Sequence, residues 1–215
     1  MNLNSRINGL VKLGNFLAQF SKAFTANEEL EVLNNKFREA MEASIIQAKI
    51  QNGWFTLDHI YLSLSAWGNT LTEGKVNEWV SNYKFNEGSK RSVGIIMAGN
   101  IPLVGFHDLV AVILSGNRAL VKLSSEDKVL IPKLLEVLVE IDAEFNDYFK
   151  LILRLENPDA VIATGSNNSA RYFEHYFGKY PHIIRKNRTS ISVIDGTETE
   201  GELCGLVEDI MLFFA

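Results

Sequence analysis

The sequence is short of cysteine and has no excess of basic residues. Its 215 residues include one cysteine, Cys204, so the chain cannot form an internal disulfide framework and offers no cysteine set for zinc. The 21 Lys and Arg residues are outnumbered by 26 Asp and Glu residues, and they are scattered along the chain. Nucleic-acid binding normally needs a concentrated basic patch. We therefore expect a small-molecule or protein partner and no nucleic acid.

Several common signatures are also absent. No apolar run reaches the length of a membrane span, and the first residues, Met1 to Ser5, show no basic region followed by an apolar run as in a signal peptide. Neither a Gly-x-Gly-x-x-Gly fingerprint nor a Gly-x-x-x-x-Gly-Lys-Ser/Thr loop occurs, so the two commonest nucleotide-binding motifs are missing. His175 and His182 lack the spacing of metal ligands. These absences predict a cytoplasmic protein without a membrane span or a metal site.

Apolar residues make up 47% of the chain, which is enough to bury an α/β core. Up to about Lys90 they recur at three- and four-residue spacing, which is typical of amphipathic helices. One such run begins at Ile7, a long helix capped by Asn27 follows, and two shorter helices are expected between residues 54 and 84. Residues 1–90 are therefore predicted to form a helical N-terminal region.

From Ser92 onward, short β-rich runs alternate with helical segments, the pattern of crossover units on a parallel sheet. Strands are expected at residues 93–97, 119–123, 151–155, 160–163, 182–185 and 190–194. Helices are expected at residues 103–114, 128–145, 169–177 and 200–215. The first of these helices should be buried, and Ser124 or Ser125 can cap the second. Residues 91–215 are therefore predicted to form a Rossmann-like, mostly parallel sheet, and the fold class is α/β.

Three strand-to-helix joints carry residues suited to binding a ligand. They are the segments 99–102, 122–125 and 164–167, and each lies at the end of a predicted strand. Ligands bind at the carboxyl ends of parallel strands, where helix amino-termini present free N–H groups and a positive dipole end. We therefore regard these joints as the candidate site.

Each joint also has a purely structural explanation. Gly99 can serve a turn that needs a positive φ, Ser166 can cap a helix, and Lys122 can be a solvated charge at a strand end. His107, on the apolar helix, is expected to be a hydrogen-bonded core residue and not a catalyst. Taken singly, no joint decides between a structural and a functional role.

The order and spacing of the three joints resemble the cofactor half of the aldehyde dehydrogenase superfamily. The matching segments are residues 93–103, 114–122 and 164–166, and the stretches 184–194 and 208–210 fit the same pattern. Within the superfamily, the sequence most resembles the long-chain acyl-CoA reductase family, which supplies fatty aldehyde in bacterial luminescence. The resemblance covers residues 91–215 and implies a reductase that acts on acyl-CoA and releases fatty aldehyde.

The resemblance implies roles by position. Asn100 matches the amide that donates a hydrogen bond to the carbonyl oxygen of the substrate or thiohemiacetal, which makes it a catalytic residue. Lys122 matches the lysine that binds the adenosine ribose, while Gly165 and Ser166 match the joint that holds the cofactor pyrophosphate. Ser125 stands where NAD-preferring members often carry a Glu, so NADP(H) is expected, with NAD(H) as the alternative. The remaining cofactor-binding residues that the resemblance implies are Ala98, Gly99 and Ser124.

Three departures from the family pattern bear on function. Leu123 replaces the proline that usually follows the lysine, and the segment 185–187 stands where aldehyde-oxidising members carry a general-base glutamate. Its Arg-Lys-Asn sequence suits acyl transfer to or from a thiol instead of hydrolysis. The family's nucleophilic cysteine is expected a few residues beyond Ala215, and Cys204 is expected at the margin of a buried helical stripe, as a packing residue. The catalytic cysteine region is thus expected to be absent, and this chain alone to be inactive.

The leading hypothesis is a reductase that takes the acyl group onto a cysteine and then delivers hydride from a nicotinamide. This chain would supply the cofactor site and Asn100, within a homo-oligomer or hetero-complex. The alternative is a non-catalytic nucleotide-binding or protein-interaction module, which turnover measurements separate from the first. A kinase-like phosphate binder is a third hypothesis, and the missing phosphate loop counts against it.

Overall fold

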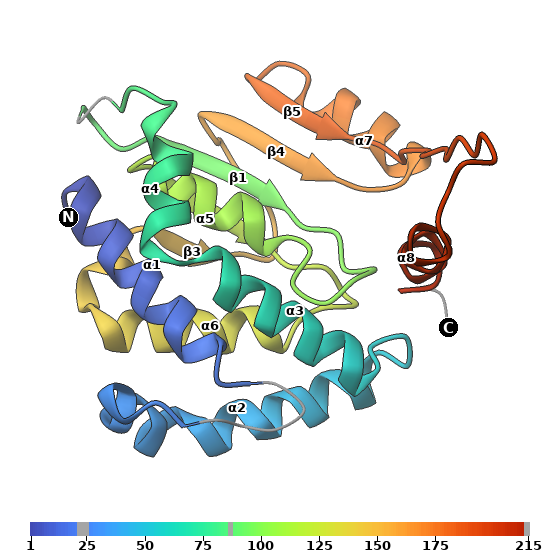
Figure 1. Ribbon diagram of the computed structural model, residues 1–215. Coiled ribbons are helices and arrows are strands. Elements are labelled where there is room, and N and C mark those ends of the chain that lie inside the picture. The colour runs from blue at the N-terminus through green and yellow to red at the C-terminus, as the bar shows by residue number, and fades with distance from the viewer. Residues whose placement is uncertain (21–25, 86–87, 213–215) are drawn as a thin grey trace.

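The computed structural model describes residues 1–20, 26–85 and 88–212, and it shows a helical part followed by a five-stranded sheet (Figure 1). The helical part comprises α1 (Leu3–Leu17), the 3₁₀ helix η1 (Glu28–Leu30), α2 (Glu31–Gln51), α3 (Leu57–Thr70) and α4 (Glu73–Ser81). Asn27 caps η1 by accepting a hydrogen bond from the Glu29 N–H at 3.0 Å. The helices predicted from apolar spacing before residue 84 are confirmed. No helix in the described ranges is long and apolar enough to cross a membrane.

All five strands are parallel, in the order β3-β2-β1-β4-β5. They are β1 (Ser92–Ile96), β2 (Arg118–Lys122), β3 (Phe149–Leu151), β4 (Ala160–Thr164) and β5 (His182–Arg185). The intervening and following helices are α5 (Phe106–Leu114), α6 (Leu130–Ile141), the 3₁₀ helix η2 (Ala143–Asp147), α7 (Asn167–Phe177) and α8 (Glu200–Met211). The chain moves outward from β1 to β3 and then returns to the other side of β1. The predicted α/β class with a parallel sheet is confirmed.

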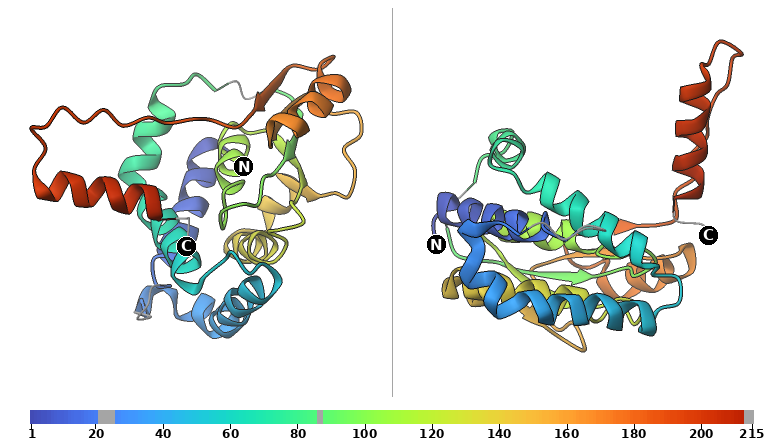
Figure 2. Two further views of the ribbon diagram at one scale, coloured as in Figure 1. Left: turned by 90° about the vertical axis from the view of Figure 1, so that its right-hand side faces the viewer. Right: turned by 60° about the horizontal axis from the view of Figure 1, so that its bottom comes forward.

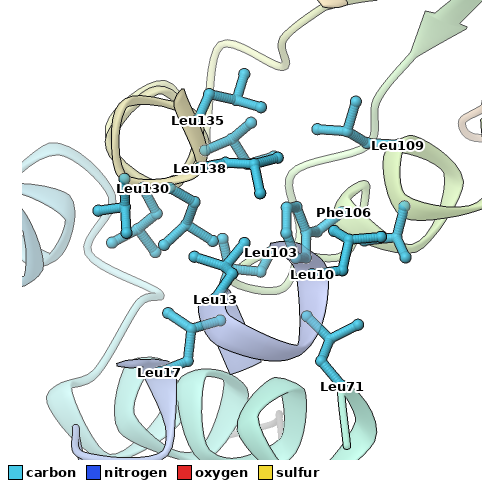
Figure 3. Close-up of a cluster of buried hydrophobic side chains, with 14 of the residues drawn as sticks. Leu10, Leu13, Leu17, Leu71, Leu103, Phe106, Leu109, Leu130, Leu135 and Leu138 are labelled. Atoms are coloured by element: carbon cyan, nitrogen blue, oxygen red, sulfur yellow. The ribbon is translucent and has the colours of Figure 1, made fainter. Parts of the chain in front are cut away.

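One hydrophobic core runs through both the helical part and the sheet part. Leucines of α1, such as Leu10 and Leu13, lie in one cluster with Leu135 and Leu138 of α6 and Phe106 of α5 (Figure 3). All five side chains are at most 2% exposed. The boundary at residue 90 therefore separates two kinds of secondary structure within a shared core, and its meaning as a domain boundary stays a prediction.

Two predicted strands differ from the structure. The run at 151–155 is wrong as a strand, because β3 covers Phe149–Leu151 and the chain then leaves the sheet to cross toward β4. Leu153 in that crossover is 96% exposed. The run at 190–194 is extended but is not a strand, and no described strand lies beyond β5 to pair with it.

Two helix starts also differ. The helix expected from residue 103 begins at Phe106, because residues 101–105 form turns with Leu103 in the left-handed region at φ 61°. The helix expected from residue 128 begins at Leu130 and is not capped by Ser124 or Ser125. Instead, the carboxylate of Asp127 accepts a hydrogen bond from the Leu130 N–H.

The last helix, α8, projects from the sheet after an extended segment (Figure 2). Residues 213–215, to which the helix was predicted to continue, lie outside the described residues. None of the described α8 residues is buried; Leu203 and Val207, for example, are 41% and 58% exposed. The expected buried stripe and the packing role of Cys204 are therefore wrong in this structure, because α8 does not lie against the core.

Candidate functional site

The carboxyl ends of β1, β2 and β4 lie side by side. β1 is the middle strand, and its last residue, Ile96, pairs with Lys122 of β2 and with Ala163 of β4. The three predicted joints therefore leave the sheet at one edge. After β1 the chain packs α5 on one face, whereas after β4 it packs α7 on the other. This is a topological switch point, where open α/β sheets bind their ligands.

The first joint follows β1 and brings Asn100 to the edge. A Cβ on Gly99 would lie 2.4 Å from Ser124 Oγ, so Gly99 is required by the close approach of the second joint. The alternative of a positive φ at Gly99 is wrong, since Gly99 is not among the described residues with a positive φ, whereas Leu103 in the following turn is. Ala98 is half-buried, whereas Asn100 is exposed, and its side-chain amide has no hydrogen-bond partner within the described residues. That amide is free to donate to a ligand.

A buried carboxylate, Asp127, ties the first joint to α6. Its Oδ2 accepts a hydrogen bond from the Leu103 N–H at 2.8 Å, in addition to the bond from the Leu130 N–H. Asp127 is 3% exposed, and its Oδ1 has no partner in the described part of the chain. Burial raises the pKa of Asp127 to about 6, although the two N–H bonds act to lower it. Asp127 thereby holds Leu103 in a backbone conformation that costs about 1–2 kcal/mol for a residue with a side chain.

The second joint begins at Lys122, the last residue of β2. Lys122 is exposed and lines a cavity, and its ammonium makes no hydrogen bond or ion pair with any described residue. Ser124 Oγ accepts from the Glu126 N–H at 3.2 Å, and Ser125 Oγ donates to the Glu126 carboxylate at 3.2 Å. The two serines thus shape the loop, and neither lines the cavity.

The third joint follows β4 and opens into α7. The Gly165 N–H donates to the Arg185 carbonyl at 3.2 Å, and a Cβ on Gly165 would lie 2.9 Å from the Ser169 Cβ. Ser166 Oγ accepts from the Ser169 N–H at 3.2 Å, which confirms Ser166 as the N-cap of α7. The first two N–H groups of α7 have no intrahelical acceptor, so they can donate to an anion at this edge.

A cavity of about 770 Å³ lies on the face of the sheet toward α7. Its walls are the ends of β1 and β2, the aromatic side chains of α7 and the segment between β3 and β4. The lining residues are Ile96, Lys122, Leu153, Arg154, Leu155, Glu156, Asn157, Pro158, Tyr172, Phe173, Tyr176, Phe177, Lys179 and Tyr180. The volume is typical of small-molecule sites, and aromatic faces beside cationic groups suit a nucleotide.

The cavity exists because the crossover between β3 and β4 has no helix. Residues 152–159 connect parallel strands that are separated by β2 and β1, and such connections usually contain one. Leu155 instead lies directly on β1, where a Cβ on Gly94 would lie 2.4 Å from the Leu155 Cδ2. A bare chain covers less of the sheet than a helix does, so this face stays open between the crossover and α7.

A buried ion pair lies on the α5 face of the same edge. One guanidinium nitrogen of Arg185, the last residue of β5, donates to both carboxylate oxygens of Asp108 at 2.7 Å. Burial acts against the charge of Asp108, but hydrogen bonds from His107 and Arg185 lower its pKa below the ordinary value. His107 itself is exposed and stacks on Trp79, with ring centroids 5.2 Å apart. Its predicted place in the core is wrong, because this position of α5 faces α4 and not the sheet.

Among the predicted site residues, all of which are described, Lys122 alone lines the cavity. The others shape the joints at the same edge. Sequence reasoning missed Asp127, although an Asp three residues before the apolar run at Leu130 is typical of a helix start. It also missed the aromatic residues of α7, which recur at helical spacing. Arg154 had no sequence signal, because its place depends on the path of the crossover.

The fold is shared with a solved aldehyde dehydrogenase. The crystal structure of an NAD-dependent benzaldehyde dehydrogenase from Corynebacterium glutamicum matches with a TM-score of 0.51 at 12% identity, over 86% of this chain and 44% of that chain. At this level of identity the likeness concerns the fold. It places the helical part and the sheet in the class of aldehyde-dehydrogenase-like α/β proteins.

The family model for acyl-CoA reductase (LuxC) matches residues 79–213, more than half of the chain. The chain therefore belongs to the acyl-CoA reductase (LuxC) family, and the predicted resemblance is confirmed. A relative, long-chain acyl-protein thioester reductase 2 from Photobacterium leiognathi, is 25% identical over 134 residues. The matched region is 55% of this chain and 28% of the relative, so the chain spans less than a third of that protein's length.

Proposed function

We propose that this chain forms the dinucleotide-binding part of a reductase that converts long-chain acyl-CoA to aldehyde with NADPH, or with NADH as the alternative. The observation that supports this function best is the Lys122 ammonium, which has no partner among the described residues and lies on the wall of a cavity at the edge where three joints meet. Membership of the acyl-CoA reductase family supports the oxidoreductase class.

The residues present fit a nicotinamide dinucleotide. The aromatic side chains of α7 offer faces for adenine, Lys122 can donate to a ribose hydroxyl, and the free N–H groups at the start of α7 can bind the pyrophosphate. When bound, the cofactor supplies the hydride. The part of this chain is to bind the cofactor and to orient it at the carboxyl edge of the sheet.

Asn100 is the proposed donor to the carbonyl oxygen of the acyl group. Its amide is exposed at the same edge, and its loop is held by the bond between Asp127 and Leu103. A donor that is fixed before the reaction stabilises the negative charge that develops on that oxygen. A complete reductase that turns over normally after Asn100→Ala would remove Asn100 from the site.

Cys204 is not the proposed nucleophile. It is exposed on α8, and α8 projects from the sheet that carries Asn100 (Figure 2). We expect no aldehyde production by this chain alone, and activity only in a longer chain that carries a further cysteine. Aldehyde production that Cys204→Ala abolishes would contradict this. The exposed apolar side chains of α8 support the prediction of an oligomer or complex.

The test of dinucleotide binding is a titration of the chain with NADPH and with NADH, in which nicotinamide fluorescence reports binding. Lys122→Ala should weaken binding by about 1–2 kcal/mol through loss of a charge-assisted hydrogen bond, and the melting temperature should hold because Lys122 is exposed. Lys128→Ala is the matched control, since Lys128 is an exposed lysine of the same loop outside the cavity. Equal affinity in both variants, or early melting of Lys122→Ala, would contradict the proposed role of Lys122.

A further inference from the structure

The cavity has more positive charge than the proposed contacts of the cofactor account for. Lys122, Arg154 and Lys179 line it, and Glu156 is the one carboxylate among the described lining residues. In the proposed function, Lys122 binds the ribose and the amino end of α7 binds the pyrophosphate. Two cations therefore remain without a role, in a cavity whose net charge favours an additional anion.

Arg154 lies at the same end of the cavity as Lys122. The crossover leaves β3 beside β2, where the Ile152 N–H donates to the Val121 carbonyl at 2.9 Å, and Arg154 follows two residues later. Lys179, by contrast, follows α7 and precedes β5, which places it toward the amino edge of the sheet. Arg154 is therefore the cation beside the proposed ribose position.

The guanidinium of Arg154 is available to bind a ligand. Its side chain is exposed, and it takes part in no hydrogen bond, ion pair or ring contact within the described ranges. The Lys179 ammonium, in contrast, lies 5.1 Å from the centroid of the Tyr180 ring. A guanidinium presents a planar fork of donors that can bind one phosphate group through two hydrogen bonds.

We propose that Arg154 binds the 2′-phosphate of NADPH and so sets the preference for NADPH over NADH. The inference rests on the proposed function, because it requires the adenosine ribose to lie at Lys122. It also changes the expected origin of that preference. Ser125, whose lack of a carboxylate predicted NADP(H), donates its hydroxyl to Glu126 and does not line the cavity. In this proposal the preference for NADPH comes from the Arg154 guanidinium and not from the lack of a carboxylate at Ser125.

The experiment is a fluorescence titration of the full chain and its variants with NADPH and with NADH. Arg154→Ala should lower the affinity for NADPH by about tenfold or more and that for NADH by less than about twofold, since NADH has no 2′-phosphate. Arg154→Lys keeps the charge and should recover part of the NADPH affinity. Lys179→Ala is the matched control, because it also removes one positive charge from the cavity wall, and it should change both affinities by the same factor.

Adenosine 2′,5′-bisphosphate and AMP, as competitors of the bound dinucleotide, test the same contact without the nicotinamide. Arg154→Ala should weaken the first competitor and leave the second unchanged. An equal loss of NADPH and NADH affinity in Arg154→Ala would overturn the inference and leave the proposed function standing. The inference would also be overturned, with the proposed function left standing, if Lys179→Ala changed the ratio of NADPH affinity to NADH affinity as much as Arg154→Ala does. A native chain that binds neither dinucleotide would overturn the proposed function and the inference together.

Discussion

The two faces of the sheet are covered to very different extents. On the face toward α5 and α6, strand residues such as Val93, Ile95 and Val121 are at most 9% exposed. α6 buries six of its 12 residues there, whereas α7 on the other face buries one of its 11. The packed face also receives α1 and α2, which lie against α6 (Figure 1). Apolar burial, and with it stability, is therefore concentrated on one side of the sheet.

The difference follows from the connections between strands. The connections from β1 to β2 and from β2 to β3 each carry a helix, and both helices lie on the packed face. The connection from β3 to β4 crosses the other face and contains no helix. The residues that suit ligand binding, Lys122 and Arg154, remain on that open face. One small sheet thus separates the side that stabilises the fold from the side that can bind a nucleotide.

The largest expected effect of a mutation is on the packed face. Leu134→Ala in α6 removes a fully buried side chain and should lower the free energy of unfolding by about 3 kcal/mol, through lost transfer energy and the cavity left behind. Leu203→Ala in α8 is the matched control; its side chain is 41% exposed, and the expected loss is below about 0.5 kcal/mol. Urea unfolding measures both. Equal losses would show that α8 contributes to the core as much as α6.

The next effect is a pH dependence of stability that comes from Asp127, which ties the first joint to α6. Its pKa is raised from 3.8 to about 6 in the folded chain, so the folded state holds the proton more tightly than the unfolded one. Protonated Asp127 therefore makes its full contribution to the free energy of unfolding below about pH 4. This contribution, of about 3 kcal/mol at most, is lost as the pH rises through about 6.

Asp127→Asn removes this titration and keeps an oxygen that can accept from the Leu103 N–H. The difference in unfolding free energy between the native chain and Asp127→Asn should therefore change between pH 4 and pH 7.5, with the native chain losing stability relative to the variant. Other titrating groups cancel in this difference. A difference that is independent of pH would show that the carboxylate of Asp127 has an ordinary pKa.

A smaller effect is expected for the ion pair beside the switch point. Asp108→Asn leaves the Arg185 guanidinium without its carboxylate and should cost about 1–2 kcal/mol of unfolding free energy, less than for a fully buried pair because the Arg185 side chain is 30% exposed. Lys186→Gln removes the surface pair with Glu174, whose side chains are 51% and 50% exposed, and should change stability little. Equal effects of the two substitutions in urea unfolding would contradict the assignment of Asp108 as a buried, paired charge.

Much of the fold could be predicted because the relevant chemistry is local. Apolar spacing located the helices of the first ninety residues, and the positive φ of Gly116, at 82°, fits the predicted end of the helix before β2. Strand prediction failed for the runs at 151–155 and 190–194, although both are rich in residue types that favour strands. A strand also needs a neighbour, and Ile191 and Val193 have none among the described strands, with exposures of 86% and 83%. The roles assigned to the residues of the three joints stay predictions.

The order of residue types along the chain was enough to establish the α/β class, the three joints and the lysine at the end of β2. It was not enough to show that Lys122 faces a cavity, that Arg154 lines the same cavity, or that a carboxylate holds the first joint. Those features depend on contacts between distant segments: Asp127 bonds a residue 24 positions away, and Asp108 bonds one 77 positions away. Backbone propensity and apolar spacing act over a few residues, whereas the order of the strands and the path of the crossover bring such groups together.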